Sequence, residues 1–327
     1  MRTRYGYFGP PGTFTEMALQ AWPGANGAEW VPISTVDTAL GAVRGGVVDF
    51  AMVPIENSVE GGVTATLDSL ATGEPLVIVG EVLVPISFVL AAPAGTGFAS
   101  VGAVGTHPHA WAQVRRWMAE HLPGASYVPA LSTAEAAAGL AGGRVAPYQA
   151  AVCAPVAAET YGLEVLASGI EDTSAAVTRF VLTARPGRVP EPTGADKTTL
   201  VLYQNDDHPG GLLALLDQFA SRGVNLTRIE SRPTGDALGR YCFSLDCEGH
   251  VADERLGETL MGLRRVCANV VFLGSYPRAD RAPVRVASGT RDEDFTRARS
   301  WLASLRDPST QPRPSGPSAT SGRSRPS

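Results

Sequence analysis

Short apolar runs and amphipathic stretches alternate along the first part of the chain. Residues 4–8 predict a short strand, and apolar side chains at helical spacing from Phe14 to Trp22 predict the helix after it. Residues 34–43 repeat the helical pattern, and residues 47–53 have the pattern of a buried strand. Helices and strands that alternate in this way predict an α/β fold.

The same alternation resumes after a long β-rich run at residues 76–90, which we interpret as a crossing between two lobes. The elements predicted next are a strand at 101–105, a helix at about 107–121, a capped helix at 132–140, a closely packed alanine-rich segment at 150–161 and a strand at 163–166. The chain then returns through a strand within residues 170–183. Two α/β lobes joined by two crossing segments predict a hinged, periplasmic-binding-protein-like module with its cleft at the crossover.

A new pattern begins after a linker rich in Pro and Gly. The predicted strands are at 197–204, 224–232, 240–248 and 269–275, with helices at 210–222 and 253–265. A βαββαβ order within about 80 residues predicts a small ferredoxin-like domain. Such a lone sheet usually pairs with a copy of itself, so we expect a homo-oligomer.

These patterns predict the following domain organisation. A first domain covers 1–185, with one lobe at about 1–80 plus 177–185 and the other at about 81–176; the linker covers 186–196, the second domain 197–277 and a C-terminal extension 278–307. The extension carries one amphipathic helix at 290–306, whose Leu302 and Leu305 we expect to face inward. Residues 308–327 have almost no apolar side chain and predict a disordered tail.

Composition narrows the classes of function. No apolar run approaches the ~18–20 residues that span a bilayer, and none near the start resembles an export signal, so we expect a cytoplasmic protein that does not bind membranes. The four cysteines have neither metal-type nor disulfide-type spacing, so we expect them to be reduced. The net charge of −5, with no basic face, argues against a nucleic-acid partner.

Two turns after predicted strands carry candidate binding groups. The glycine-rich turn at 9–13 leads into a helix start, where backbone N–H groups suit an anion such as a carboxylate, although a plain strand-to-helix turn has the same pattern. In the turn at 54–61, Asn57 and Glu60 fit a capping box, which leaves Glu56 and Ser58 unexplained. Ligands of open α/β sheets bind at such strand ends, so we expect one shared cleft.

Further polar residues stand out on the return strand and before the helix at 107–121. Thr178 and Arg179 precede an apolar run, and unpaired buried polar groups cost about 1–3 kcal/mol each; they are either a strand-edge Thr with an ion-paired Arg, or part of a site. His107 and His109 have no carboxylate or cysteine spaced to complete a metal site, so we expect no metal and a role as helix cap or cleft wall.

Several ordered motifs between residues 4 and 277 carry a resemblance. In the first domain they are Gly9-Pro10-Pro11-Gly12-Thr13-Phe14, Pro54-Ile55-Glu56-Asn57-Ser58-Val59-Glu60-Gly61, Thr106-His107-Pro108, Ile170-Glu171-Asp172 and Thr178-Arg179-Phe180; in the second they are Pro209-Gly210-Gly211-Leu212, Gly223-Val224-Asn225-Leu226, Glu230-Ser231-Arg232-Pro233 and Leu273-Gly274-Ser275-Tyr276-Pro277. The chain resembles prephenate dehydratases with a C-terminal ACT regulatory domain. Ala176 departs from the family, which often has Asn there. No chorismate mutase segment precedes the first strand, so we expect the monofunctional form.

The resemblance implies a carbon–oxygen lyase that converts prephenate to phenylpyruvate, water and carbon dioxide in L-phenylalanine biosynthesis, without a cofactor. The residues implied as catalytic are Thr178, which would hydrogen-bond the departing hydroxyl, Glu56 as a relay, Arg179 as a carboxylate ligand and Phe180 as an apolar wall. Gly12, Thr13, Asn57 and Ser58 would bind the substrate. A structural ion pair of Arg179, with Asp172 as one partner, is the alternative for that residue.

The resemblance also implies feedback by L-phenylalanine bound between paired ACT domains. The residues implied in effector binding and transmission are Gly210, Gly211, Leu212, Asn225, Leu226, Glu230 and Ser231. We expect a dimer or tetramer formed through the two kinds of domain. Two other functions stay open: an arogenate dehydratase, with the same chemistry on an aminated side chain, and an amino-acid sensor without catalysis.

Overall fold

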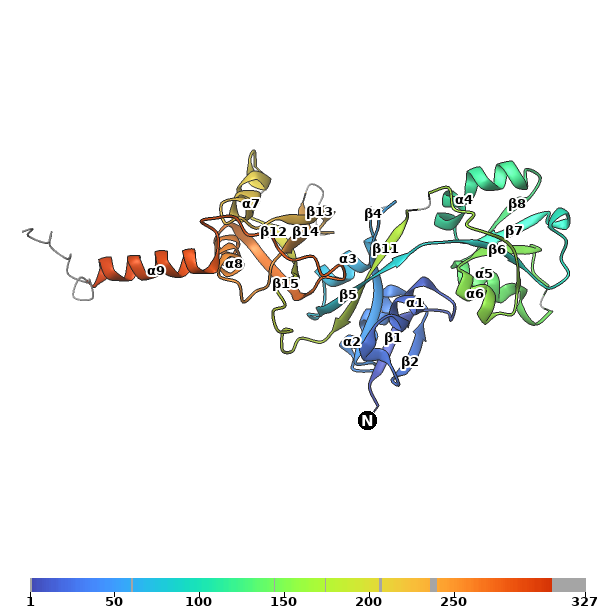
Figure 1. Ribbon diagram of the computed structural model, residues 1–327, viewed down its shortest axis with the longest axis horizontal. Coiled ribbons are helices and arrows are strands. Elements are labelled where there is room, and N and C mark those ends of the chain that lie inside the picture. The colour runs from blue at the N-terminus through green and yellow to red at the C-terminus, as the bar shows by residue number, and fades with distance from the viewer. Residues whose placement is uncertain are drawn as a thin grey trace, which may run out of the picture.

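Three separate β-sheets organise the chain, one in each of three bodies arranged in a row (Figure 1). The computed structural model describes residues 2–59, 61–143, 145–173, 175–205, 208–235 and 240–307. The first lobe lies in the middle, the second lobe on one side of it and the C-terminal domain on the other. No helix among these residues is long and apolar enough to cross a membrane.

The central sheet contains both ends of the first domain. Its strand order is β2 (Glu29–Ile33), β1 (Arg4–Phe8), β3 (Phe50–Asn57), β11 (Val177–Ala184) and β5 (Val77–Pro85), with the short β4 (Gly61–Gly62) also paired to β3. Strand β1 runs parallel to β2 and β3, whereas β11 runs antiparallel to both of its neighbours. The predicted return strand is therefore confirmed, and it inserts between β3 and β5.

Three helices cover this sheet, and their apolar side chains form its core. They are α1 (Phe14–Gln20), α2 (Val36–Arg44) and α3 (Thr64–Ala71), with a 3-10 turn at Pro23–Ala25. Leu40 and Leu70 from the helices are buried with Ile55 of β3 on one face of the sheet. Leu19 of α1 is buried with Met52 of β3 on the other. These helices begin where the strands end, which brings their N-termini to one edge of the sheet.

The second lobe has a five-stranded sheet of its own. The order is β10 (Glu164–Ser168), β6 (Val89–Ala92), β9 (Ala150–Cys153), β7 (Ala103–Thr106) and β8 (Ser126–Pro129). Its helices are α4 (Pro108–His121), α5 (Thr133–Leu140) and α6 (Pro155–Thr160), with 3-10 turns at Phe98–Ser100 and Ala141–Gly143. The two lobes are joined after β5 and before β11. Because β5 pairs with β11 as far as Pro85, the first lobe extends past the boundary expected at residue 80.

The C-terminal domain has the predicted βαββαβ order. Its elements are β12 (Asp196–Gln204), α7 (Gly211–Ala220), β13 (Leu226–Pro233), β14 (Tyr241–Glu248), α8 (Glu254–Val266) and β15 (Cys267–Pro277), in the sheet order β13-β14-β12-β15. This sheet packs on the first lobe, since Tyr276 and Val201 belong to the same buried cluster as Leu70. Gly274, at φ 125°, lies so close to the Ile78 carbonyl that a Cβ would overlap it.

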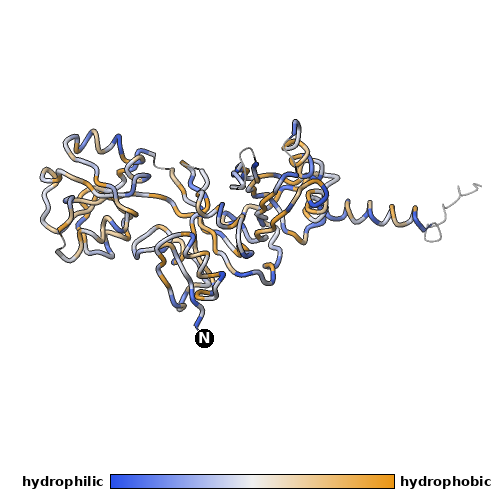
Figure 2. The backbone as a smooth tube through the Cα atoms, turned by 180° about the vertical axis from the view of Figure 1, so that it is seen from behind, coloured by the Kyte–Doolittle hydropathy of each residue, from blue (hydrophilic) through white to orange (hydrophobic). Residues whose placement is uncertain are grey.

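Helix α9 (Asp292–Arg306) follows the domain and projects away from it (Figure 1). It forms where a helix was predicted, but none of its residues is buried, so the expectation that Leu302 and Leu305 face inward is wrong. Figure 2 shows the helix alternating between hydrophilic and hydrophobic residues along its length. The tail predicted at 308–327 lies outside the described residues.

Candidate active site

A cavity of about 820 Å³ lies between the two lobes. The first lobe contributes Phe8, Thr13, Phe14, Thr15, Val36, Pro54, Asn57, Gly61, Gly62, Val63, Thr64, Ala65, Thr178 and Phe180. The second lobe and its connection contribute Ile86, Phe88, His107, His109, Ala110, Gln113, Leu131, Ser132 and Thr133. Phe14 and Phe88 meet edge to face across the lobes, with ring centroids 5.7 Å apart. The predicted convergence of the strand-end turns in one cleft is confirmed.

Thr178 and Asn57 form the polar centre of the first-lobe wall. They are direct partners in the β3–β11 pairing, and Asn57 Nδ2 donates a 2.8 Å hydrogen bond to Thr178 Oγ1. Asn57 Oδ1 accepts from the Val59 backbone N–H at 2.8 Å, which fixes the orientation of the amide. Because the Thr178 oxygen accepts from Asn57, its own proton points to another acceptor. This geometry suits donation to a ligand in the cavity.

The first turns of five helices, α1 to α5, contribute residues to the cavity. Thr13 caps α1, donating to the Phe8 carbonyl at 3.0 Å and accepting from Glu16 N–H at 3.3 Å. Val63 precedes α3 and supplies no capping side chain to that helix. None of the described residues that line the cavity is lysine or arginine. Helix N-termini carry partial positive charge and N–H donors, which suit an anion at these walls.

The second-lobe wall carries polar side chains that sequence reasoning did not assign to the substrate. His107 caps α4, and its Nδ1 accepts from the His109 N–H at 3.3 Å. When neutral, His107 therefore carries its proton on Nε2. The expectation that His107 and His109 act as helix cap and cleft wall is confirmed. Gln113, one helical turn after His109, also lines the cavity; its helical spacing from the His pair was the signal that could have found it.

Comparison with known proteins decides the family. A family model described as prephenate dehydratase matches residues 5–188. A prephenate dehydratase of Amycolatopsis methanolica is 48% identical over 304 residues, which cover 93% of this chain and 98% of the relative. The chain belongs to the prephenate dehydratase family. With that family it belongs to the hydro-lyases, which release water from their substrate.

Two solved structures resemble the prephenate dehydratase fold described here over most of its length. A prephenate dehydratase from Arthrobacter aurescens in complex with L-Phe has a TM-score of 0.89 and 55% identity, covering 93% of this chain and 99% of that one. GqqA, described as a novel type of quorum quenching acylase, has a TM-score of 0.72 and 34% identity, covering 84% of this chain and 98% of that one.

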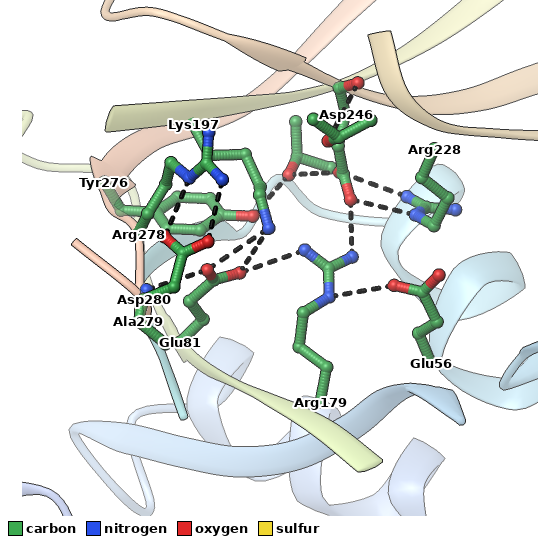
Figure 3. Close-up of polar contacts among 12 residues, drawn as sticks. Glu56, Glu81, Arg179, Lys197, Arg228, Asp246, Tyr276, Arg278, Ala279 and Asp280 are labelled. Atoms are coloured by element: carbon green, nitrogen blue, oxygen red, sulfur yellow. Dashed lines mark hydrogen bonds and ion pairs between the residues drawn. The ribbon is translucent and has the colours of Figure 1, made fainter. Parts of the chain in front are cut away.

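Within this prephenate dehydratase fold, neither Arg179 nor Glu56 lines the cavity. Figure 3 shows their side chains pointing toward each other. Successive side chains of a strand point to opposite faces, so Arg179 points away when Thr178 and Phe180 point in. Its guanidinium pairs with Glu56, Glu81 and Asp246. The expectations that Arg179 binds a substrate carboxylate and that Glu56 relays a proton to Thr178 therefore do not fit the structure.

The alternative of a structural ion pair for Arg179 has the right kind of contact but the wrong partner. Asp172 instead accepts from the backbone N–H groups of Arg116 and Trp117, at 2.9 and 3.1 Å. Burial by itself lowers the pKa of the Arg179 guanidinium, but the carboxylates of Asp246, Glu81 and Glu56, with Tyr276, raise it well above its ordinary value. Arg179 therefore stays charged among its partners.

Two other residues expected to bind substrate also have structural contacts instead. Ser58 exchanges hydrogen bonds with the backbone of Val177, its Oγ accepting from the N–H at 2.9 Å and its own N–H donating to the carbonyl at 2.9 Å. Gly12 donates to Glu16 Oε2 at 2.5 Å, and a Cβ on it would lie 2.9 Å from Ala157 Cα in the second lobe. Neither residue is among those that line the cavity. Glu60, the expected capping partner of Asn57, lies outside the described residues.

The residues expected to bind an effector lie in the C-terminal domain, and none of them lines the cavity. Gly210, at φ 85°, precedes the first turn of α7, which Gly211 and the half-exposed Leu212 begin. Asn225 precedes β13, which carries Leu226, Glu230 and Ser231. These residues therefore lie at the start of α7 and on or just before β13, within motifs quoted for the C-terminal domain.

Proposed function

We propose that this chain converts prephenate to phenylpyruvate, water and carbon dioxide, and that Thr178 assists the departure of the ring hydroxyl. The observation that carries the proposal is the Thr178 hydroxyl, held by Asn57 in the interlobe cavity with its proton directed to another acceptor. Loss of the hydroxyl and the ring carboxylate together makes an aromatic ring. The driving force therefore lies in the substrate, and the protein has to hold it and help hydroxide leave as water.

The walls of the cavity fit these two tasks. Prephenate is a dianion, and the N-termini of α1 to α5 offer N–H donors and positive dipole ends for its carboxylates. Phe180, Phe88 and Phe14 supply an apolar surface. A dry wall beside the carboxylate that is lost favours the less charged transition state.

The hydroxyl of a threonine is too weak an acid to be an ordinary proton donor, so Thr178 acts by positioning and polarising. With Glu56 on the other face of the strand, the proton has to come from elsewhere. His107 and His109 are the ionisable side chains among the described residues that line the cavity. We assign to His107 a hydrogen bond to the departing hydroxyl, donated by its Nε2–H because Nδ1 accepts from a backbone N–H. The proton that turns the leaving hydroxide into water comes from solvent.

We further propose that the C-terminal domain is an ACT domain that binds L-phenylalanine and feeds back on the reaction. Its βαββαβ order and the similarity to a relative crystallised with L-Phe support this. Gly210, Gly211, Leu212, Asn225 and Leu226 would hold the amino acid, while Glu230 and Ser231 would transmit its presence. The domain exposes Leu213 at 70% and Ile229 at 42%, which supports pairing with a second copy in a homo-oligomer.

The test is an assay of the purified chain with prephenate, arogenate and an N-acylated amine as separate substrates. We expect phenylpyruvate from prephenate at a higher kcat/KM than phenylalanine from arogenate. Faster turnover of arogenate would identify an arogenate dehydratase, and deacylation alone would give the chain the activity in the name of GqqA. Binding of phenylalanine without any turnover would identify a sensor.

A further inference from the structure

Arg179 lies where carboxylates from three different strands meet (Figure 3). Its Nε is 3.1 Å from Glu56 of β3, its Nη1 is 3.0 Å from Glu81 of β5, and its Nη2 pairs with Asp246 of β14. The side chains of Arg179, Glu81 and Asp246 are at most 5% exposed, whereas Glu56 is 37% exposed. The strand that carries Thr178 is thus joined to the C-terminal domain by a buried ion pair.

The same carboxylates hold other groups of the C-terminal domain. Asp246 accepts from Arg228 Nε at 2.9 Å and Nη2 at 3.2 Å, and from the Thr199 hydroxyl at 2.7 Å. Glu81 accepts from Lys197 Nζ at 2.9 Å and from the Ala279 N–H at 2.9 Å. We call Arg179, Glu81, Lys197, Arg228 and Asp246 the interdomain ion network. It joins β5 and β11 of the first lobe to three strands of the C-terminal domain.

Buried charges that lose a partner are costly, because neither water nor another counter-ion takes its place. Burial raises the pKa of the Asp246 carboxyl, but the guanidinium groups of Arg179 and Arg228 outweigh this and hold it well below its ordinary value. Asp246 therefore stays ionised between its two arginines. A displacement of β14 relative to the first lobe has to carry Arg179 with it or leave each of these two buried charges with one partner fewer.

A second contact reaches the cavity wall from the same direction. Glu230 of β13 lies 3.6 Å from Arg228 Nη1, and its carboxylate is so close to Gly62 that a Cβ there would overlap it. Gly62 lines the cavity and pairs with Glu56. The C-terminal domain therefore touches the back of the wall beside Asn57 as well as beside Thr178.

We infer that Arg179 is a positioning residue that couples the ligand state of the C-terminal domain to Thr178 through Asp246. A shift of β14 moves Arg179 and the strand β11. It thereby changes the position of Thr178 relative to Asn57. A ligand of the C-terminal domain changes the reaction only if it binds one arrangement of the network better than another. The inference rests on the proposed function, since it assigns the route by which feedback reaches the reaction.

Two other contacts of the C-terminal domain provide control variants, which test whether the network only holds the domains together. Tyr203 donates a 2.8 Å hydrogen bond to the Ala71 carbonyl, which is an interdomain contact away from β11. Glu248, two residues after Asp246 on the same strand, pairs with Arg278 at 2.6 Å within the C-terminal domain. Tyr203→Phe removes a domain contact without touching the network, and Glu248→Gln removes a charge of the same strand.

The experiment compares full-length wild type with Asp246→Asn, Arg179→Lys and the two controls. L-phenylalanine affinity is measured by calorimetry, and prephenate kcat and KM are measured without and with saturating L-phenylalanine. Hydrogen exchange of residues 177–184 is followed under the same two conditions. Both network variants should bind L-phenylalanine within about threefold of wild type. The inhibition ratio, which is kcat without L-phenylalanine divided by kcat with it, should fall at least about fivefold toward one. The controls should keep the wild-type ratio.

Hydrogen exchange separates this inference from the proposed function. L-phenylalanine should change protection of β11 in wild type and in the controls, and leave it unchanged in both network variants. That result supports the coupling even if prephenate is not a substrate, which would overturn the proposed function alone. Three results would overturn the inference. They are coupling that persists in both network variants, coupling that is lost equally in Tyr203→Phe, and a wild type that binds L-phenylalanine but shows no coupling. If Asp246→Asn shows no cooperative unfolding, Arg179→Lys and Asp246→Glu decide by the same criteria.

Discussion

Thr178 and Arg179 are neighbours in sequence whose side chains leave β11 on opposite faces. Thr178 accepts a 2.8 Å hydrogen bond from Asn57 at the cavity, and Arg179 pairs with Glu81 and Asp246 behind it. One dipeptide thus joins the proposed reaction centre to the C-terminal domain. The roles of the two residues are therefore separable by mutation.

Asn57→Asp tests the direction of the hydrogen bond to Thr178. A carboxylate accepts only, so the Thr178 proton would turn toward residue 57 instead of the ligand, and the added charge would repel a dianionic substrate. We expect kcat/KM for prephenate to fall by about 10²-fold or more, with the thermal midpoint nearly unchanged. The exposed change Asn26→Asp in the same lobe is the control and should retain activity. Wild-type kcat/KM in Asn57→Asp would remove this hydrogen bond from the mechanism.

His107→Asn separates hydrogen bonding to the substrate from helix capping. Asparagine is a good N-cap, so α4 should keep its first turn while the imidazole is lost. We expect kcat to fall by about 10²-fold, because the imidazole N–H donor is lost. His121→Asn, on the last turn of the same helix, should leave kcat unchanged. An unaltered kcat in His107→Asn would limit His107 to its capping role.

Gly12→Ala tests whether the lobes have to meet closely at the turn before α1. Gly12 and Gly27 both have φ in the left-handed region, at 87° and 72°, so alanine costs about 1–2 kcal/mol of backbone strain at either site. A Cβ at Gly12 would also press on Ala157 of the second lobe, whereas nothing lies within 4 Å of one at Gly27. We expect Gly12→Ala to lower thermal stability more than Gly27→Ala and to raise KM for prephenate. Equal effects of the two changes would show that the lobes need not approach here.

The ionisation of Asp246 makes the free energy of unfolding depend on pH at the acid end. Its pKa in the folded protein is held below its ordinary value by Arg179 and Arg228, despite the opposing effect of burial. Its contribution is therefore complete above the unfolded pKa of about 3.9 and is lost as pH falls below that value. Urea unfolding should show a constant stability gap between wild type and Asp246→Asn from pH 6 to 8, on the order of a few kcal/mol. The gap should narrow below about pH 4; a gap that widens there would contradict the assignment.

The sequence predicted the parts of the site that depend on local order. Strand-end turns at Thr13 and Asn57, a capped helix at His107 and a return strand with Thr178 follow from spacing, and their convergence follows from the rule for strand ends. It also predicted the βαββαβ order of the C-terminal domain. The strand period alone already requires Thr178 and Arg179 to face apart, although it does not say which of them faces the cavity.

The remaining features depend on contacts between distant segments. Arg179 and Asp246 are 67 residues apart and belong to different domains, so no local pattern marks them as partners. The motif resemblance assigned Arg179, Ser58 and Gly12 to the substrate, and each of them is the sequence neighbour of a residue that does line the cavity. Their side chains or backbone instead serve the strand pairing, the domain junction and the lobe contact. Gln113 was missed because its spacing from His109 places both residues on one helix face but does not say that this face meets the cavity.

The most direct test of the central claim is turnover of prephenate by Thr178→Ala and Thr178→Ser beside Thr183→Ala. Thr183 lies on the same strand, but its hydroxyl donates to the Ala51 carbonyl at 3.0 Å, away from the cavity. We expect Thr178→Ala to lose about 10²–10⁴ in kcat, Thr178→Ser to keep most of it, and Thr183→Ala to lose stability but not kcat. Wild-type kcat in Thr178→Ala, or the same loss in Thr183→Ala, would contradict the account.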